Sequence, residues 1–176
     1  MSPQISTAAL EQCVFQNLWR AQRVAQFIAP IRVIPLFHIV TAEDDWMFSV
    51  PMPKDTEAGR RLMELLRDFM ALKRAVAFVV AGEISAPNAL WSIGVSPTHQ
   101  YGLMSLVQHD PLSFGDPVVF DPAQTGIAVP SLVPTCPSSL PDLRRQEIEI
   151  TFGPNGSIPA TRLAKPGTSR AKANAA

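Results

Sequence analysis

The apolar positions in the first part of the chain recur every three or four residues. They are Val14, Leu18, Ala21, Ala25 and Ile28. This spacing places them on one face of a helix. Ser6 or Thr7 can cap the start of that helix, and Pro30 ends it because the residue before a proline avoids helical geometry. We therefore predict a helix that runs to about residue 29.

Two apolar runs follow, separated by a short acidic connection. Arg32–Thr41 is apolar on both of its alternating faces, which predicts a strand that is covered on both sides. Trp46, Phe48 and Val50 share one side of a second run. The residues between the two runs, 42–45, are few enough to make a hairpin connection.

A second helical pattern covers Thr56–Lys73, after the helix-capping residue Asp55. Its buried stripe is predicted to be Leu62, Leu65, Leu66, Phe69 and Leu72. Arg60, Glu64 and Asp68 are four residues apart, so we expect them to pair along the outside of the helix.

The next segment is dominated by strands. Ala75–Ala81 is short, rich in β-branched residues and entirely apolar, which predicts a central strand buried on both faces. Leu90–Val95 and Tyr101–Gln108 are predicted strands, and Val118–Phe120 adds a short one. Residues 111–142 contain seven prolines, which forbid a long helix there.

Arg145–Phe152 alternates polar and apolar residues, so we predict a strand with one solvated face. Asn155 and Gly156 form a strong tight-turn signal, and Ser157–Leu163 would complete a hairpin with that strand. Residues 164–176 are small, polar and basic, as in a disordered tail.

These elements predict one α+β domain over residues 1–163 and a disordered basic tail over 164–176. The sheet should be mainly antiparallel, because hairpins predominate, and two helices should pack on it. A Pro-rich loop region should precede the last strands.

The distribution of positive charge changes this picture. From Ala75 to Leu143 the chain has no lysine and no arginine, and all fifteen basic residues lie outside that stretch. Ordinary usage would place roughly eight there. The segment is therefore buried, engaged with a partner, or part of a loop-rich acidic surface.

Composition excludes several classes of protein. The net charge is +0, which argues against a dedicated nucleic-acid-binding protein. We find no secretory signal and no apolar run long enough for a transmembrane helix. Cys13 and Cys136 are far apart and lack metal-ligand spacing, so a reduced, cytoplasmic setting is the expectation.

Imidazole and carboxylate groups in the cation-free segment are the candidate metal ligands. Glu83 follows the central strand, and His99, His109, Asp110 and Asp116 could approach it if the strands fold back. No two of the histidines have the spacing of a known metal motif. A solvated turn is the competing reading for Glu83. His38 lies in an apolar strand and is expected to be a hydrogen-bonded core residue.

No catalytic constellation stands out elsewhere. The chain lacks a Gly-x-Ser-x-Gly elbow and a phosphate-cradling glycine loop, and no cofactor is implied. Tryptophan is enriched at binding hot spots. We expect Trp19 and Trp46 to pack in the core. Trp91, with Tyr101 and Leu103, is the candidate interface.

Two segments resemble a pattern found in uncharacterised bacterial α+β proteins. One is the apolar strand that ends in an acid, AVAFVVAGE (75–83). The other is PSSLPDLRRQEIEI (137–150). The preceding hairpin and helix agree in order, so the resemblance spans roughly residues 33–152. It implies an α+β fold and a bacterial source, and the family has no established activity to carry over.

The favoured hypothesis is a small cytosolic bacterial protein that works without catalysis, by self-association or by binding another protein. The alternative is a metal-assisted, hydrolase-like enzyme that uses Glu83 with His99, His109 and Asp110. A nucleic-acid accessory role for the basic residues of the second helix is weaker, because acids are interleaved with them.

Overall fold

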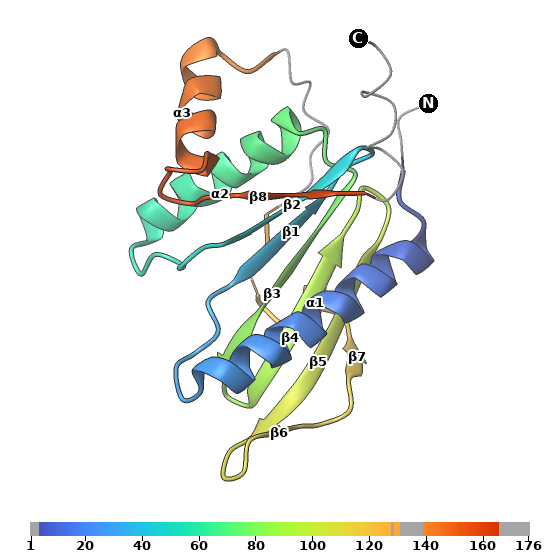
Figure 1. Cartoon of the computed structure of the whole chain (residues 1–176). Coiled ribbons are helices and arrows are strands. Elements are labelled where there is room, and N and C mark those ends of the chain that lie inside the picture. The colour runs from blue at the N-terminus through green and yellow to red at the C-terminus, as the bar shows by residue number, and fades with distance from the viewer. Residues whose placement is uncertain (1–3, 128, 131–138, 166–176) are drawn as a thin grey trace.

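The computed structural model describes residues 4–127, 129–130 and 139–165 and has an α+β fold (Figure 1). The helices are α1 (Thr7–Ile28), α2 (Thr56–Leu72) and α3 (Asp142–Phe152), with a 3-10 turn, η1 (Pro122–Gln124). The strands are β1 (Leu36–Val40), β2 (Asp44–Ser49), β3 (Ala77–Ser85), β4 (Asn88–Val95), β5 (Gln100–Gln108), β6 (Ser113–Phe114), β7 (Val118–Phe120) and β8 (Thr161–Ala164).

The strands form one sheet in the order β6-β5-β4-β3-β1-β2-β8, and β7 pairs with β5 beside β6. All pairings among the described strands are antiparallel. The predicted β1–β2 hairpin is present, with Phe37 opposite Phe48. The predicted fold class, a mainly antiparallel α+β sheet packed by helices, is confirmed.

Helices cover the two faces of this sheet separately. α1 lies across one face, while α2 and α3 lie on the other (Figure 1). Side chains of a strand alternate between faces. In β3, Val79 therefore packs in the core beneath α1, while Phe78 and Val80 pack in the core beneath α2. This double cover explains why the run 75–81 is apolar at every position.

The two long helices start and end where the sequence predicts. Ser6 caps α1 by accepting a hydrogen bond from the Ala9 N–H at 3.2 Å, and Asp55 does the same for Ala58 at 2.8 Å in α2. α1 stops at Ile28, two residues before Pro30. Both capping predictions are confirmed.

The C-terminal part of the sequence prediction is wrong. Residues 142–152 form α3 and not a strand. Ile148 and Phe152 are its buried residues, and a spacing of four satisfies both the two-residue period of a strand and the helical period. Ile150, which the alternation assigned to the same face, is exposed. β8 consequently pairs with β2 and not with residues 145–152.

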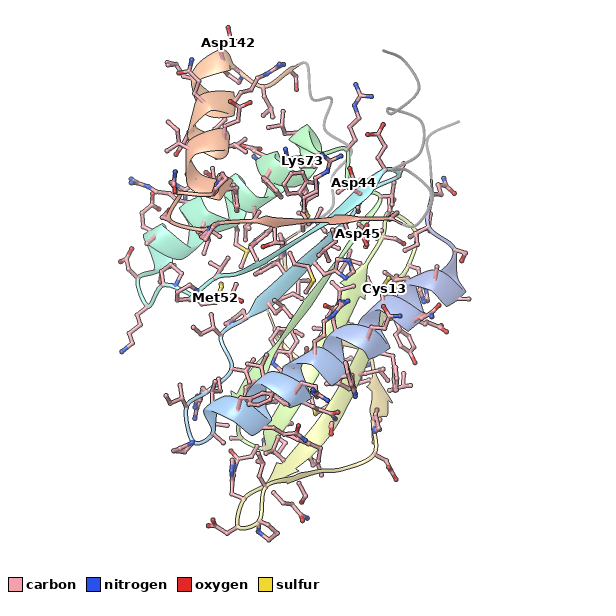
Figure 2. All side chains as sticks on the ribbon, in the orientation of Figure 1. Cys13, Asp44, Asp45, Met52, Lys73 and Asp142 are labelled. Atoms are coloured by element: carbon pink, nitrogen blue, oxygen red, sulfur yellow. The ribbon has the colours of Figure 1, made fainter. Side chains whose placement is uncertain are left out.

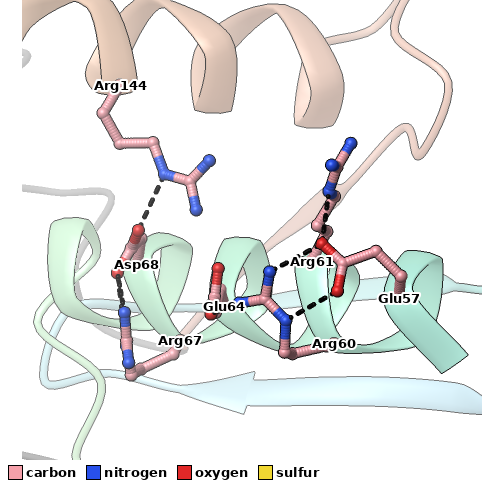
Figure 3. Close-up of polar contacts among 7 residues, drawn as sticks. All are labelled: Glu57, Arg60, Arg61, Glu64, Arg67, Asp68 and Arg144. Atoms are coloured by element: carbon pink, nitrogen blue, oxygen red, sulfur yellow. Dashed lines mark hydrogen bonds and ion pairs between the residues drawn. The ribbon is translucent and has the colours of Figure 1, made fainter.

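The added helix changes the ion pairs of α2 (Figure 3). Arg60 pairs with Glu64 as predicted and also with Glu57, and both pairs are exposed. Asp68 is buried instead of pairing outward with these residues. Its carboxylate accepts a hydrogen bond from Arg144 Nε of α3 at 2.7 Å. This partly buried ion pair therefore ties α3 to α2.

The cation-free segment contains the middle of the sheet. β3, β4 and β5 lie within it, and seven of the eight residues of β4 are buried. Burying an ammonium or guanidinium group without a partner is costly, which accounts for the missing lysines and arginines in these strands.

The predicted disordered tail lies mostly outside the described residues, which end at 165. Ala164 belongs to β8, and Lys165 Nζ lies 3.1 Å from Asp45 Oδ1. Within the described part of the chain, no helix has both the length and the apolar content needed to cross a membrane.

Candidate functional site

A chain of polar side chains joins α1 to the β1–β2 hairpin, and Figure 2 labels Cys13 on α1 and Asp45 on the hairpin. Asn17, on the buried face of α1, has its Nδ2 atom 2.9 Å from His38 Nδ1 on β1. His38 Nε2 lies 2.8 Å from Asp45 Oδ2 on β2. Asn17 is fully buried and His38 nearly so. The prediction that His38 is a hydrogen-bonded core residue is confirmed.

The neighbours of Asn17 fix the orientation of its side-chain amide. Its Nδ2 donates to the Cys13 carbonyl oxygen at 2.8 Å, and its Oδ1 accepts from Arg20 Nη1 at 3.3 Å. Because a carbonyl oxygen only accepts and a guanidinium only donates, the amide has one orientation. His38 Nδ1 must then accept, so Nε2 is the ring nitrogen that donates to Asp45.

Two cations approach the carboxylates at the end of the hairpin. Lys165 Nζ lies 3.1 Å from Asp45 Oδ1, and Arg162 Nε of β8 donates to Asp44 at 2.7 Å. Burial raises the pKa of Asp45, but the hydrogen bonds from His38 and Lys165 outweigh burial and hold the pKa below its usual value. The network therefore joins α1, the hairpin and β8 through an ionised Asp45.

The same geometry gives no activated nucleophile. Burial is the largest cause of a raised pKa for the Cys13 thiol, and the nearby Asp45 carboxylate raises it further. A thiol is nucleophilic as the thiolate, so this environment opposes reactivity. Both nitrogens of His38 are already committed to Asn17 and Asp45. The arrangement is suited to holding α1 against the hairpin and not to nucleophilic catalysis.

We expect Asp45→Asn to lower stability at pH 7 by about 1–2 kcal/mol, because it weakens hydrogen bonds made to a charged group. The pKa of Asp45 is lowered in the folded state. Its ionised form therefore contributes stability above its unfolded pKa of about 3.9, and the contribution is lost as pH falls through the folded pKa. Urea unfolding between pH 7 and 3 should show the variant converging on the wild type below about pH 4. Glu43→Gln, at an exposed neighbour, is the control. A constant difference at every pH would contradict the assignment.

The four predicted metal ligands do not come together. Glu83 and His109 line the same small cavity, where Glu83 Oε2 accepts a hydrogen bond from the Val33 N–H at 3.0 Å. His99 lies beyond the far end of β4, because Glu83 pairs with Leu90 at one end while Val95 pairs with Gln100 at the other. There the His99 Nε2 atom lies 4.0 Å from Glu11 Oε1.

Asp110 lies in the turn between β5 and β6. In the described part of the chain, no group of three or more histidine, cysteine, aspartate or glutamate side chains could hold a metal ion. The geometry therefore gives the predicted metal site no support.

The predicted interface residues lie in or against the core. Trp91 is 7% exposed and Leu103 is 6% exposed, and Tyr101 packs partly buried against the core beneath α1. Trp91 can be buried because its cross-strand neighbour is Gly82. An added Cβ at that position would lie only 2.8 Å from the indole ring. The missing side chain makes room for the tryptophan.

The exposed aromatic surface is instead on α1. Phe15, Trp19 and Phe27 are 54%, 53% and 81% exposed, so the prediction that Trp19 packs in the core is wrong. With Arg23 they form a row of residues four apart, which we call the α1 row. Arg23 places its guanidinium 5.2 Å from the centre of the Trp19 ring. Figure 1 shows α1 on the outside of the sheet, with no helix or strand of the described residues over it.

α1 is therefore apolar on two faces. One face buries Leu10, Val14, Leu18 and Ala21 against the sheet, and the other presents the α1 row to solvent. The signal is readable in the sequence, because the spacing of four is regular. A helix that is apolar on more than one side is usually buried on more than one side.

A scan against protein-family models, a search of curated proteins and a search of solved structures found no match to this chain. The resemblance to bacterial α+β proteins is therefore untested, and any function must be argued from the geometry.

Proposed function

We propose that this protein is a non-catalytic module that works by self-association, with the α1 row as its contact surface. The observation that carries the proposal is the regular row of exposed aromatic residues on a helix whose opposite face is already buried. Apolar patches of this kind on a soluble surface mark interaction sites. The free Cys13 thiol fits the cytoplasmic setting that we expect.

The order of residues in the α1 row favours a second copy of the same chain as the partner. In a two-fold dimer, each residue of one helix meets a residue of the same surface on its partner. Suppose that two α1 helices pack antiparallel, with the two-fold axis level with Ala21 along the helix. Phe15 then meets the partner's Phe27, and Trp19 meets the partner's Arg23. Apolar side chains then face apolar ones, and a guanidinium faces an indole ring, which attracts cations. The row is complementary to itself.

The size of the surface is consistent with this arrangement. The three aromatic residues of the α1 row leave on the order of 300–450 Å² of side chain in water, taking about 150–250 Å² for a whole aromatic side chain. A standard interface buries about 800 Å² on each partner, with a few aromatic anchors near its centre. α1 is about 33 Å long and supplies the rest from the polar residues beside the row.

Electrostatics do not oppose such a dimer. The formal net charge is +0, so two copies experience little mutual repulsion. α1 carries a single acid, Glu11, and that residue lies toward the His99 side of the helix. The α1 row itself contains one charge, Arg23, and in the proposed dimer it meets the Trp19 ring of the other copy.

Sedimentation equilibrium tests the proposal directly. We expect the mass to rise from the chain value of 19.2 kDa toward twice that value as concentration increases, with a dissociation constant in the micromolar range or tighter. High salt should change the constant little, because the contacts are mostly apolar. A mass that stays at that of one chain up to about a millimolar would remove self-association as the function.

A further inference from the structure

A second surface feature lies beside the α1 row. A groove of about 350 Å³ separates α1 from the segment that joins β6 to β7. Phe15, Trp19 and Phe114 supply aromatic walls, and Gln22 and Asp116 are among its polar lining residues. Its volume is in the range of small-molecule sites, which are mostly apolar with a few placed polar groups.

Hydrogen bonds across the floor hold the two walls of this groove in place. Gln22 Nε2 of α1 donates to Ser105 Oγ of β5 at 3.2 Å, and Ser105 Oγ donates to the Gly115 carbonyl oxygen at 2.6 Å. Ser105 is fully buried. The helix, the strand and the β6–β7 segment are thus fixed relative to one another, so the groove is formed before any ligand arrives.

These contacts also fix which polar atoms remain for a ligand. Ser105 has one hydroxyl proton and uses it on Gly115, so it must accept from the amide of Gln22. The Gln22 Oε1 atom is then the acceptor left over. Asp116 is exposed and has no hydrogen bond or ion pair with any residue that the structure describes. The groove therefore offers acceptors, one of them charged.

The strands beside the groove, β5, β6 and β7, contain no lysine or arginine that could pair with the Asp116 carboxylate. The segment from Ala75 to Leu143 has no lysine or arginine, and it supplies the groove residues Phe114, Gly115, Asp116 and Pro117. Arg23 lies over the ring of Trp19, which shows that this indole accepts a cation. Aromatic faces together with an unpaired carboxylate attract an organic cation more than a neutral or anionic molecule.

We propose that this groove binds a small organic cation, namely a protonated amine or guanidinium carried on an apolar body. The apolar body packs between Phe15, Trp19 and Phe114. The cationic group donates hydrogen bonds to Asp116 and to the Gln22 amide oxygen. The groove and the α1 row share Phe15 and Trp19, so a bound cation and a second copy of the chain compete for these two side chains.

Benzylammonium and benzyl alcohol form a matched pair of probes, since they share size and aromatic ring and differ in charge. We expect benzylammonium to shift the indole N–H signal of Trp19 saturably in a ¹⁵N NMR titration, with a dissociation constant in the millimolar range. Benzyl alcohol should bind about tenfold more weakly. Asp116→Asn should weaken benzylammonium binding about three- to tenfold, whereas Asp110→Asn, outside the groove, should leave it unchanged.

Equal binding of the two probes, or full affinity in Asp116→Asn, would overturn the proposal. So would the absence of any saturable shift up to about 50 mM probe, since that limit lies well above the expected constant. The titration is repeated on Phe27→Glu, whose substitution lies outside the groove lining. Binding that persists there separates the groove from self-association, so each idea can fail without the other.

Discussion

Phe27→Glu should convert the dimer to a single chain across the whole micromolar range. In the two-fold arrangement each substitution occurs twice, because Phe27 of either copy meets Phe15 of the other. Loss of an aromatic anchor costs about 2 kcal/mol or more, so two such losses weaken association about 1000-fold. The glutamate also brings a carboxylate against an apolar surface, where it has no partner. Sedimentation equilibrium measures the change in the dissociation constant.

Leu143→Glu is the matched control for this variant. Leu143 is 80% exposed and Phe27 is 81% exposed, so both substitutions place a carboxylate on an open helix surface. Leu143 lies on α3, on the opposite side of the sheet from α1. Neither change should alter folding by more than about 0.5 kcal/mol, as is usual for surface substitutions. If both variants dissociate equally, or neither does, the α1 row is not the contact.

Gly94→Val should lower the free energy of unfolding by about 3 kcal/mol, the upper part of the range for inserting bulk into a packed core. Gly94 lies on β4 directly beneath α1. An added Cβ there would lie 2.5 Å from Val14 Cγ2 and 2.9 Å from Leu10 Cδ1. Val14 is β-branched and held in one rotamer on the helix, so it cannot turn aside. The helix must lift, and urea unfolding reports the loss.

A glycine with open space around it provides the opposite expectation. Gly59 lies in α2 and has no atom within 4 Å of an added Cβ. Gly59→Ala should raise stability by about 0.5–1 kcal/mol, because alanine favours the helix and restricts the unfolded chain. Gly94→Val with unchanged stability would mean that α1 does not lie this close to β4.

The sequence was sufficient to predict most of the fold, because long amphipathic helices and buried strands carry periodic signals. Both long helices, the β1–β2 hairpin and the central strand are where periodicity placed them. α3 was missed because Ile148 and Phe152 fit two periods at once. Asp142, in the first turn of α3, was a local signal for a helix start, because an acid there suits the helix dipole. The partner of β8 depends on long-range packing, which no local pattern reports.

The candidate site was harder to predict, because burial of a tryptophan depends on its cross-strand neighbours. Trp91 is buried because Gly82 faces it, and Trp19 is exposed because it lies opposite the buried face of α1. The cation-free segment suggested an interface, and within it most residues of β3 and β4 are buried while Leu106, Val118 and Val119 are exposed. The polar chain from Asn17 through His38 to Asp45 joins residues of three elements, so it required the fold to be known.

The arrangement of two α1 helices is the central claim, and a distance between copies tests it most directly. A spin label is placed on the exposed Ala8→Cys in a chain whose Cys13 and Cys136 are replaced by alanine. Residue 8 lies thirteen positions from the proposed axis at Ala21, so an antiparallel pair separates the two labels by about 35–40 Å. Pulsed electron paramagnetic resonance should give that distance at dimer concentrations. A distance under about 20 Å, as in a parallel pair, or no coupled spins at all, would contradict the account.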